Sequence, residues 1–214
     1  TLMVISALGA PIFAPYDPIQ LNIMERLQGP SVNHLLGTDQ LGRDLFSRVL
    51  FGGQVALKVA FLTIGLALIV GIVLGLIAGY GPAWLDNSIM LLFDTIRSVP
   101  TIMLALAAVT VVGPSITTVI FVVAVSSIPN YGRIVRTQTL TLKSKDFVKA
   151  EKLMGASLLR ILSIHLLPNI LGPLLILASM DIPTVIALEA GLSFLGMGVK
   201  PPTPSWGSIL NDGF

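Results

Sequence analysis

Hydrophobic residues along this chain form long continuous runs separated by short polar segments. Residues 59–80 contain no charged side chain, and residues 98–132 contain none either. About 20 mostly apolar residues suffice for a helix to cross the hydrocarbon core of a bilayer. The pair Gly113-Pro114 divides the second run, because proline lacks a backbone donor and its ring clashes with the preceding turn. The pattern therefore predicts membrane-spanning helices at 59–80, 88–112, 115–132 and about 168–190.

The pattern is that of helices rather than strands. Strands of a membrane barrel alternate between apolar and polar residues, and an open sheet edge cannot satisfy its backbone groups in lipid. Residues 1–14 fit the outer end of a further helix whose start precedes the sequence. We therefore predict an all-α fold, a polytopic membrane helix bundle without a linker.

Composition supports a membrane protein and excludes several functional classes. Of the 214 residues, 54% are hydrophobic and 11% are charged, whereas an average soluble domain has about 25% charged residues. A net charge of +2 without a basic run gives no indication of nucleic-acid binding. The absence of cysteine excludes disulfides and thiolate metal sites. No metalloprotease or serine-hydrolase motif is present, so we predict no catalytic residue, no metal and no cofactor.

The distribution of basic residues predicts the orientation. Seven of the 13 lysines and arginines lie between residues 131 and 160, and cytoplasmic loops carry an excess of positive charge. This segment is therefore expected in the cytoplasm. Counting spans outward from it places 81–87 in the cytoplasm and both 15–57 and 191–214 outside.

The basic segment itself predicts two short helices joined by a corner. Ser144 or Asp146 suits the start of the first helix, and Gly155 suits its end. Ser157 suits the start of the second helix, and Pro168 opens the next span. Apolar residues of the first helix recur at helical spacing, at Phe147, Ala150, Leu153 and Met154. This apolar face indicates either a docking surface for a partner or a segment that lies on lipid headgroups.

The outer segment contains a turn rich in glycine and aspartate, at residues 34–48. From Leu41 onward the pattern predicts a short amphipathic helix that lies at the membrane interface, with Arg43 and Arg48 at headgroup level. A metal site at His34 and Asp39 is disfavoured, because only one imidazole is nearby.

Several polar and small residues fall inside the predicted spans. Asp181 and Glu189 are costly there and are candidates for the pore wall; alternatively, they have structural partners. Asp94 and Arg97 are spaced to pair on one helix. A glycine face lets another helix approach closely, as packing or as a sliding subunit interface, and comprises Gly71, Gly75 and Gly79. Three prolines are candidates for kinks or a gate: Pro100, Pro173 and Pro183.

The cytoplasmic corner resembles the Glu-Ala-Ala loop of bacterial ABC importer permeases. In that pattern Glu-Ala-Ala is followed by three residues, a glycine, nine further residues and then Ile-x-Leu-Pro. The residues in register are Ala150, Gly155, Leu167 and Pro168, and the departures are Lys149, Glu151 and His165. The resemblance implies a coupling helix at about 146–156 that docks on an ATP-binding subunit. The residues implied in this contact are Phe147, Ala150, Glu151, Met154, Gly155, Ala156 and Ser157.

A second motif resembles the dipeptide, oligopeptide and nickel branch of that family, in its second permease type. The outer segment reads Leu-Gly-Thr-Asp-x-x-Gly-Arg-Asp, with signature residues Gly37, Thr38, Asp39, Gly42, Arg43 and Asp44. The stretches 191–199 and 201–207 are similar to the same group. The resemblance implies a type I permease fold with six spans, about five of them present here. It also implies two parts, residues 1–56 with the outer segment and residues 57–214 with a permease core that ends before the last span.

The function implied is that of a membrane subunit of an ATP-driven importer, which moves small peptides by alternating access. Expected partners are ATP-binding subunits, a second permease subunit in a heterodimer, an extracytoplasmic solute-binding protein and the lipid bilayer. The expected location is the cytoplasmic membrane of a bacterium or archaeon. No P-loop motif is present, so ATP hydrolysis is expected in a partner. Alternatives are a nickel-chelate or glutathione importer of the same family, or a secondary transporter that uses Asp181 and Glu189 as ion sites.

Overall fold

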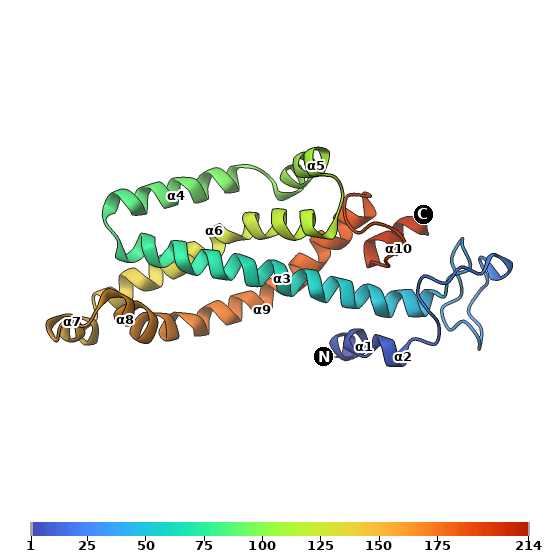
Figure 1. Ribbon diagram of the computed structural model, residues 1–214, viewed down its shortest axis with the longest axis horizontal. Coiled ribbons are helices and arrows are strands. Elements are labelled where there is room, and N and C mark those ends of the chain that lie inside the picture. The colour runs from blue at the N-terminus through green and yellow to red at the C-terminus, as the bar shows by residue number, and fades with distance from the viewer. Residues whose placement is uncertain (1, 214) are drawn as a thin grey trace. The chain divides into compact units, whose positions relative to one another are not determined.

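The computed structural model describes residues 2–213, which form helices joined by loops (Figure 1). Within that range there is no β-strand, only an isolated antiparallel bridge between Thr38 and Asp44. In chain order the helices are α1 (Leu2–Leu8), α2 (Ala10–Phe13), η1 (Ile23–Glu25), α3 (Leu45–Tyr80), α4 (Ala83–Ser98), α5 (Thr101–Val112), α6 (Ile116–Lys143), α7 (Asp146–Leu153), α8 (Leu158–Arg160), η2 (Ile161–Leu166), α9 (Leu167–Phe194) and α10 (Trp206–Asp212).

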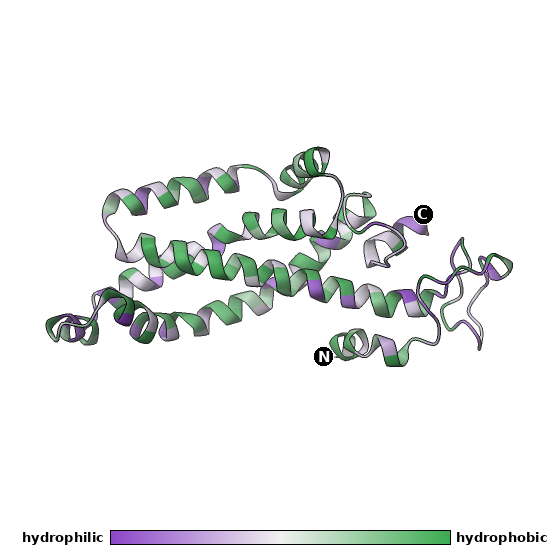
Figure 2. Ribbon diagram, in the orientation of Figure 1, coloured by the Kyte–Doolittle hydropathy of each residue, from purple (hydrophilic) through white to green (hydrophobic). Residues whose placement is uncertain are grey.

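Three continuous helical stretches in this range are long and apolar enough to cross a membrane. They are α3, α6 and the stretch from α8 to α9, and a fourth span results if α4 and α5 count together. Their ribbons are hydrophobic over much of their length (Figure 2). Only 33% of the most apolar window of α3 is buried within the chain, which suits a helix that faces lipid. The predicted all-helical membrane fold is confirmed.

Predicted helix boundaries hold at some breaks and fail at others. The break at Gly113-Pro114 is confirmed, since α5 ends at Val112 and Gly113 has a φ of +90°. The single predicted helix 88–112 is wrong, because it is interrupted at Val99 and Pro100. Val99 is extended, with φ −100° and ψ 124°, the conformation that a following proline favours.

Two further boundaries differ because helices continue where loops or new starts were predicted. Helix α6 runs on to Lys143, so Arg133 and Arg136 lie on a helix rather than in the cytoplasmic loop. Pro168 does not open a separate span. It lies in the first turn of α9, which follows directly on the π-helical stretch η2.

The described chain divides into two compact units. The first contains residues 2–62, 102–123 and 182–213, and the second contains residues 63–101 and 124–181. The separate division into parts 1–56 and 57–214 stays a prediction.

Close helix packing organises the second unit. A Cβ at Gly75 would lie 2.5 Å from the Gly132 carbonyl oxygen, and one at Gly71 would lie 2.8 Å from the Tyr131 Cβ. On the other side of α6, a Cβ at Gly132 would lie 2.3 Å from the Phe93 ring. Small residues therefore let α3, α4 and α6 pack closely, as in other membrane helix pairs. Of the two roles considered for the glycine face, the structure shows helix packing within the chain, at Gly71 and Gly75.

Ion pairs join the same helices. Arg136 Nη2 lies 2.6 Å from Asp86 Oδ2, and Arg133 donates to Asp94, in both cases from α6 to α4. The predicted pair between Asp94 and Arg97 is wrong, since Arg97 donates instead to Asn130 Oδ1 at 2.7 Å. A charge within apolar helices is stabilised by a partner on the next helix, which spacing within one helix does not reveal.

Candidate functional site

The cytoplasmic corner is built by α7, a glycine turn and the start of α8. Gly155 has a φ of +80°, and the Ala156 amide donates to the Glu151 carbonyl at 3.0 Å. This is the left-handed glycine exit that favours glycine over any residue with a Cβ. The Ser157 side chain then caps the next turn by accepting from the Arg160 amide. The predicted helix, glycine turn and serine cap are all present.

The start of α7 differs from the prediction. Its N-cap residue is Lys145, and no side chain caps it. Ser144 is occupied elsewhere, because its hydroxyl donates to the Thr141 carbonyl at 2.9 Å. Asp146 is the first residue of the helix, where its charge suits the positive end of the helix dipole.

One side of α7 is buried and the other is open. Val148, which sequence analysis did not single out, is fully buried in the second unit. Leu153 is 90% exposed and Met154 is 73% exposed. We call the exposed apolar set the corner patch; it comprises Phe147, Ala150, Leu153, Met154, Leu158 and Leu159. Beside it, a depression of about 310 Å³ is lined by Glu151, Met154, Gly155, Ala156, Ser157 and Arg160.

Two departures from the family pattern face each other at this corner. His165 Nε2 lies 3.4 Å from Glu151 Oε1, where the pattern has isoleucine and alanine. Both side chains are largely buried, with 24% and 20% exposure. The Glu151 carboxylate is therefore directed at α8–η2 within this chain. The sequence shows both departures but does not reveal that they are neighbours.

Tyr80, at the end of α3, connects the corner to the rest of the second unit. Lys152 of α7 lies 4.9 Å from the centre of the Tyr80 ring, and Lys143 of α6 lies 5.2 Å from it. Lys143 also donates to the Tyr80 carbonyl at 3.0 Å. These cation–π contacts join α7, α6 and α3 at one point.

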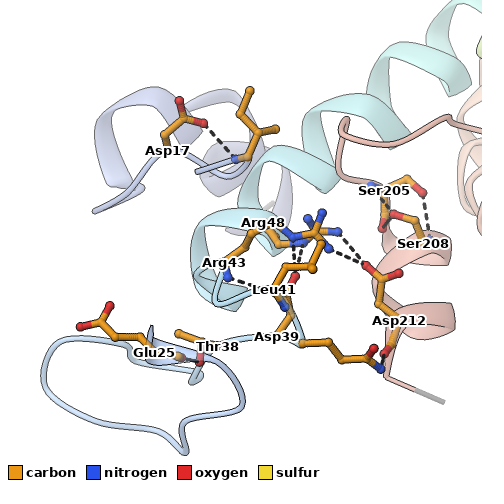
Figure 3. A network of polar contacts seen from close by, with 12 residues as sticks. Asp17, Glu25, Thr38, Asp39, Leu41, Arg43, Arg48, Ser205, Ser208 and Asp212 are labelled. Carbon is orange, nitrogen blue, oxygen red and sulfur yellow. Dashed lines mark hydrogen bonds and ion pairs between the residues drawn. The ribbon is translucent and has the colours of Figure 1, made fainter. Parts of the chain in front are cut away.

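The outer signature forms a buried charge network in the first unit (Figure 3). Arg43 Nε lies 2.6 Å from Asp39 Oδ2, and Arg43 Nη2 lies 2.9 Å from Asp212 Oδ2 on α10. Arg48 is 2% exposed, and its Nη2 lies 3.1 Å from the same Asp212 oxygen. We call these four residues the outer charge network. The prediction of an interfacial helix with both arginines at headgroup level is wrong, because α3 begins at Leu45 without a break and both guanidinium groups are buried.

Hydrogen bonds hold Asp39 in its charged form. Burial raises the pKa of this carboxyl, but hydrogen bonds from the Arg43 and Leu41 amides and from the Arg43 side chain outweigh it. The pKa of Asp39 therefore lies below its ordinary value. Asp39 is thus an anion that organises the turn between Thr38 and Arg43.

The remaining signature residues shape the same turn. Thr38 Oγ1 accepts from the Gln28 amide at 2.9 Å. Gly37 and Gly42 have positive φ, and a Cβ at Gly42 would lie 1.7 Å from the Asn22 carbonyl oxygen. Asp44 accepts from the Ser47 amide at 2.8 Å at the start of α3. Each of these signature positions therefore has a local structural role.

His34 also belongs to this folded segment. Its partner is Asp44, and not Asp39, which was considered with it for a metal site. Its Nδ1 lies 2.9 Å from Asp44 Oδ1, and its ring stacks on Tyr16 with centroids 4.9 Å apart. The hydrogen bond to Asp44 raises the pKa of His34 above its ordinary value. His34 is thereby explained as part of the fold of the outer segment.

The two acids of α9 have different surroundings. Asp181 accepts from the Tyr131 hydroxyl at 2.7 Å in the second unit. Glu189, in the first unit, is 1% exposed and accepts from Ser193 at 2.6 Å, and Ser193 in turn accepts from the Val199 amide. Each acid thus has a structural partner, and a role in the pore stays a prediction.

Residues 71–214 match the family described as "Binding-protein-dependent transport system inner membrane component". The chain is similar to the dipeptide transport system permease protein DppC of Alkalihalophilus pseudofirmus, with 39% identity over 99% of this chain and 70% of that protein. It is also similar to the glutathione transport system permease protein GsiD of Escherichia coli O157:H7, with 42% identity over the same shares.

A solved structure, that of the MetNI methionine ABC transporter in inward-facing conformations, shares the fold. One of its chains matches with a TM-score of 0.62 and 21% identity, over 71% of this chain and 76% of that one. On the strength of the family match and the long, closely similar relatives, the chain belongs to the binding-protein-dependent transport system inner membrane components, the membrane permeases of ABC importers.

Proposed function

We propose that this permease carries small peptides across the cytoplasmic membrane and that α7 couples it to a partner ATPase. The solute class rests on the relatives, one of which is named as a dipeptide permease and another as a di/tripeptide permease. The identity of about 40% extends over almost the whole chain. Family membership also decides against the secondary transporter, which would not need a docking corner.

The corner patch is the observation that carries the coupling role. Leu153, Met154 and Leu159 are each more than 70% exposed, and a group of exposed apolar residues on a loop expected in the cytoplasm favours an interaction site. The alternative is contact with lipid headgroups. A protein partner is favoured because the patch surrounds a turn fixed by Gly155 and Ser157, so its shape is set before binding.

The proposed cycle uses subunits that this chain does not contain. An extracytoplasmic binding protein delivers the peptide, and a second permease completes the pore. Closure of two ATP-binding subunits moves α7, and the contacts of Lys152 and Lys143 with Tyr80 pass that movement to α3 and α6. The permease itself holds no P-loop and contributes no catalytic group.

The test is a charge placed in the corner patch. Leu153→Glu should abolish co-purification of the ATPase subunits with the permease, or lower solute-stimulated ATP hydrolysis at least tenfold. Burying an unpaired carboxylate in an apolar interface costs several kcal/mol. Because Leu153 is 90% exposed, the permease itself should keep its melting temperature.

Val32→Glu is the matched control, since Val32 is an exposed aliphatic residue of the outer segment. It should retain the ATPase subunits. If Leu153→Glu also retains them and hydrolysis stays coupled to uptake, the corner patch does not dock on an ATPase, and the lipid-headgroup role takes its place.

Glutathione is a second candidate solute, because permeases named for it are 42% identical to this chain. Glutathione is itself a tripeptide, so the same pore chemistry suits both. Uptake of radiolabelled dialanine by vesicles that hold the full importer, with and without excess glutathione, separates the two. Strong competition favours a shared route, and no competition restricts the proposal to ordinary peptides.

A further inference from the structure

Arg97, near the end of α4, is exposed within this chain, and its charge has no acidic partner among the described residues. The nearest acid in sequence, Asp94, is paired with Arg133. In the described chain Arg97 makes no ion pair, and its guanidinium donates instead to the neutral Asn130 amide oxygen at 2.7 Å. Arginines within membrane helices are costly, and they mark pathways or binding sites when they face protein or water.

Arg97 and Asn130 lie at similar distances from the ends of their helices. Arg97 lies near the end of α4, about 21 Å along the helix from its cytoplasmic start at Ala83, at 1.5 Å per residue. Asn130 lies about 20 Å from the cytoplasmic end of α6 at Lys143. The two residues therefore lie at matching heights along α4 and α6, which agrees with the hydrogen bond between them.

A polar cavity opens beside Arg97. It measures about 230 Å³ and lies at the interruption between α4 and α5, where Pro100 ends one helix and Thr101 begins the next. Asn130 and Ser126 of α6 line its other side. The Ser126 hydroxyl is buried and has no hydrogen-bond partner in the described chain. Transporters commonly build solute sites from discontinuous helices.

The lining of this cavity suits an anion. Its polar groups are a guanidinium, two hydroxyls and an amide, and its described lining contains no carboxylate. Arginine binds carboxylates through two parallel hydrogen bonds. The volume is below that of a typical site for a drug-sized molecule, so it fits one end of a small peptide. Every peptide with a free C-terminus carries such a carboxylate.

We propose that Arg97, with Ser126 and Thr101, binds the C-terminal carboxylate of the peptide during its passage. The inference rests on the proposed peptide function and deepens it. The cavity is a transient binding site that the solute enters after release from the binding protein. The competing occupant, an acidic side chain of the second permease, is one of the outcomes below.

The test uses the full importer in lipid vesicles and radiolabelled dialanine. Arg97→Gln should lower dialanine uptake about tenfold or more, since a hydrogen-bonded charge pair is lost, while the subunits still co-purify. Arg97→Lys keeps the charge without the paired donors and should retain more uptake than Arg97→Gln. Arg26→Gln, an exposed arginine of the outer segment without an ion pair in the described chain, should behave as wild type.

Each other outcome overturns the proposal in a distinguishable way. Unchanged uptake in Arg97→Gln removes the carboxylate site and leaves the peptide function standing. Loss of the second permease from the Arg97→Gln assembly shows that Arg97 binds that subunit instead. If wild-type vesicles take up no dialanine, the peptide function fails, and the inference fails with it.

A second measurement leaves Arg97 in place. The chain has no cysteine, so Thr101→Cys introduces a single thiol into this subunit at the cavity. An anionic methanethiosulfonate should react several-fold faster than a cationic one, because Arg97 makes the cavity positive. Dialanine should slow that reaction. Equal rates for the two reagents, or no protection by dialanine, would overturn the proposal.

Discussion

Single residues of the outer signature act through partners that are far away in the sequence. Arg43 and Asp212 are 169 positions apart, yet their side chains are 2.9 Å apart. The sequence predicted the turn at Gly37 to Gly42 from local glycine and aspartate chemistry. It could not predict the burial of Arg48, because the carboxylates that neutralise it come from two other segments, 34–44 and α10.

Asp39→Asn tests whether the outer charge network is structural. It removes the charge shared by Arg43 and Arg48, both largely buried, so the free energy of unfolding should fall by roughly 3 kcal/mol. Because the pKa of Asp39 is lowered, the wild-type stabilisation is present above its ordinary value of 3.8 and is lost as the pH falls through the lower folded-state value. The measurement is the melting temperature of the solubilised assembly.

Asp17→Asn is the control, since Asp17 is exposed and Asn keeps the oxygen that accepts from the Ile19 amide. It should melt as wild type does. If Asp39→Asn melts normally but blocks uptake, the signature acts directly in transport and the structural account is wrong.

The ends of helices could be predicted wherever the residues at the end itself determine it. Gly113 and Gly155 mark ends that the structure confirms. The C-terminal end of α6 was missed because Arg133 and Arg136 were expected in a loop, whereas they pair with acids of α4. The start of α3 was missed because a separate interfacial helix was expected from Leu41. Arg136 belongs to α6 since Asp86 of α4 neutralises it, a contact between segments that hydrophobic periodicity does not contain.

Gly75→Ala tests the contact between α3 and α6. The new methyl group would lie 2.5 Å from the Gly132 carbonyl oxygen and 2.6 Å from the Val135 Cβ, so the two helices must move apart. We expect a loss of about 1–3 kcal/mol of stability, typical of overpacking, seen as a lower melting temperature.

Gly65→Ala lies on the same helix, and its Cβ would meet nothing within 4 Å. It should be neutral or slightly stabilising, by about 0.5–1 kcal/mol, since alanine loses less entropy in a helix. Equal effects of the two substitutions would show that helix propensity, not close packing, governs these glycines.

The molecule as a whole is a membrane subunit whose orientation follows from its charges. After Arg133 and Arg136 are paired with acids, the remaining basic residues of the segment surround the corner: Lys143, Lys145, Lys149, Lys152 and Arg160. Anionic lipids and the positive-inside rule both hold such a cluster in the cytoplasm. The corner and the outer segment are therefore expected on opposite sides of the membrane.

Cysteine labelling checks this orientation directly, because the chain contains no cysteine. In right-side-out vesicles a membrane-impermeant maleimide should label the Val32→Cys variant and spare the Met154→Cys variant. Inside-out vesicles should give the reverse. Both positions are well exposed within the permease, so in vesicles that hold the permease without ATP-binding subunits a failure to label reflects sidedness rather than burial. Labelling of both variants from the same side would contradict the orientation.

The close approach of α3 and α6 at Gly71 and Gly75 has a mechanical consequence. The backbones of α3 and α6 are in direct contact, and the ion pairs Asp86–Arg136 and Asp94–Arg133 join α6 to α4. These helices therefore have little room to bend or to slide past one another. Under the proposed coupling, a force applied at α7 would enter this block through Tyr80. The block would then turn as a rigid body, so that little of the nucleotide-driven work is lost in deforming the protein.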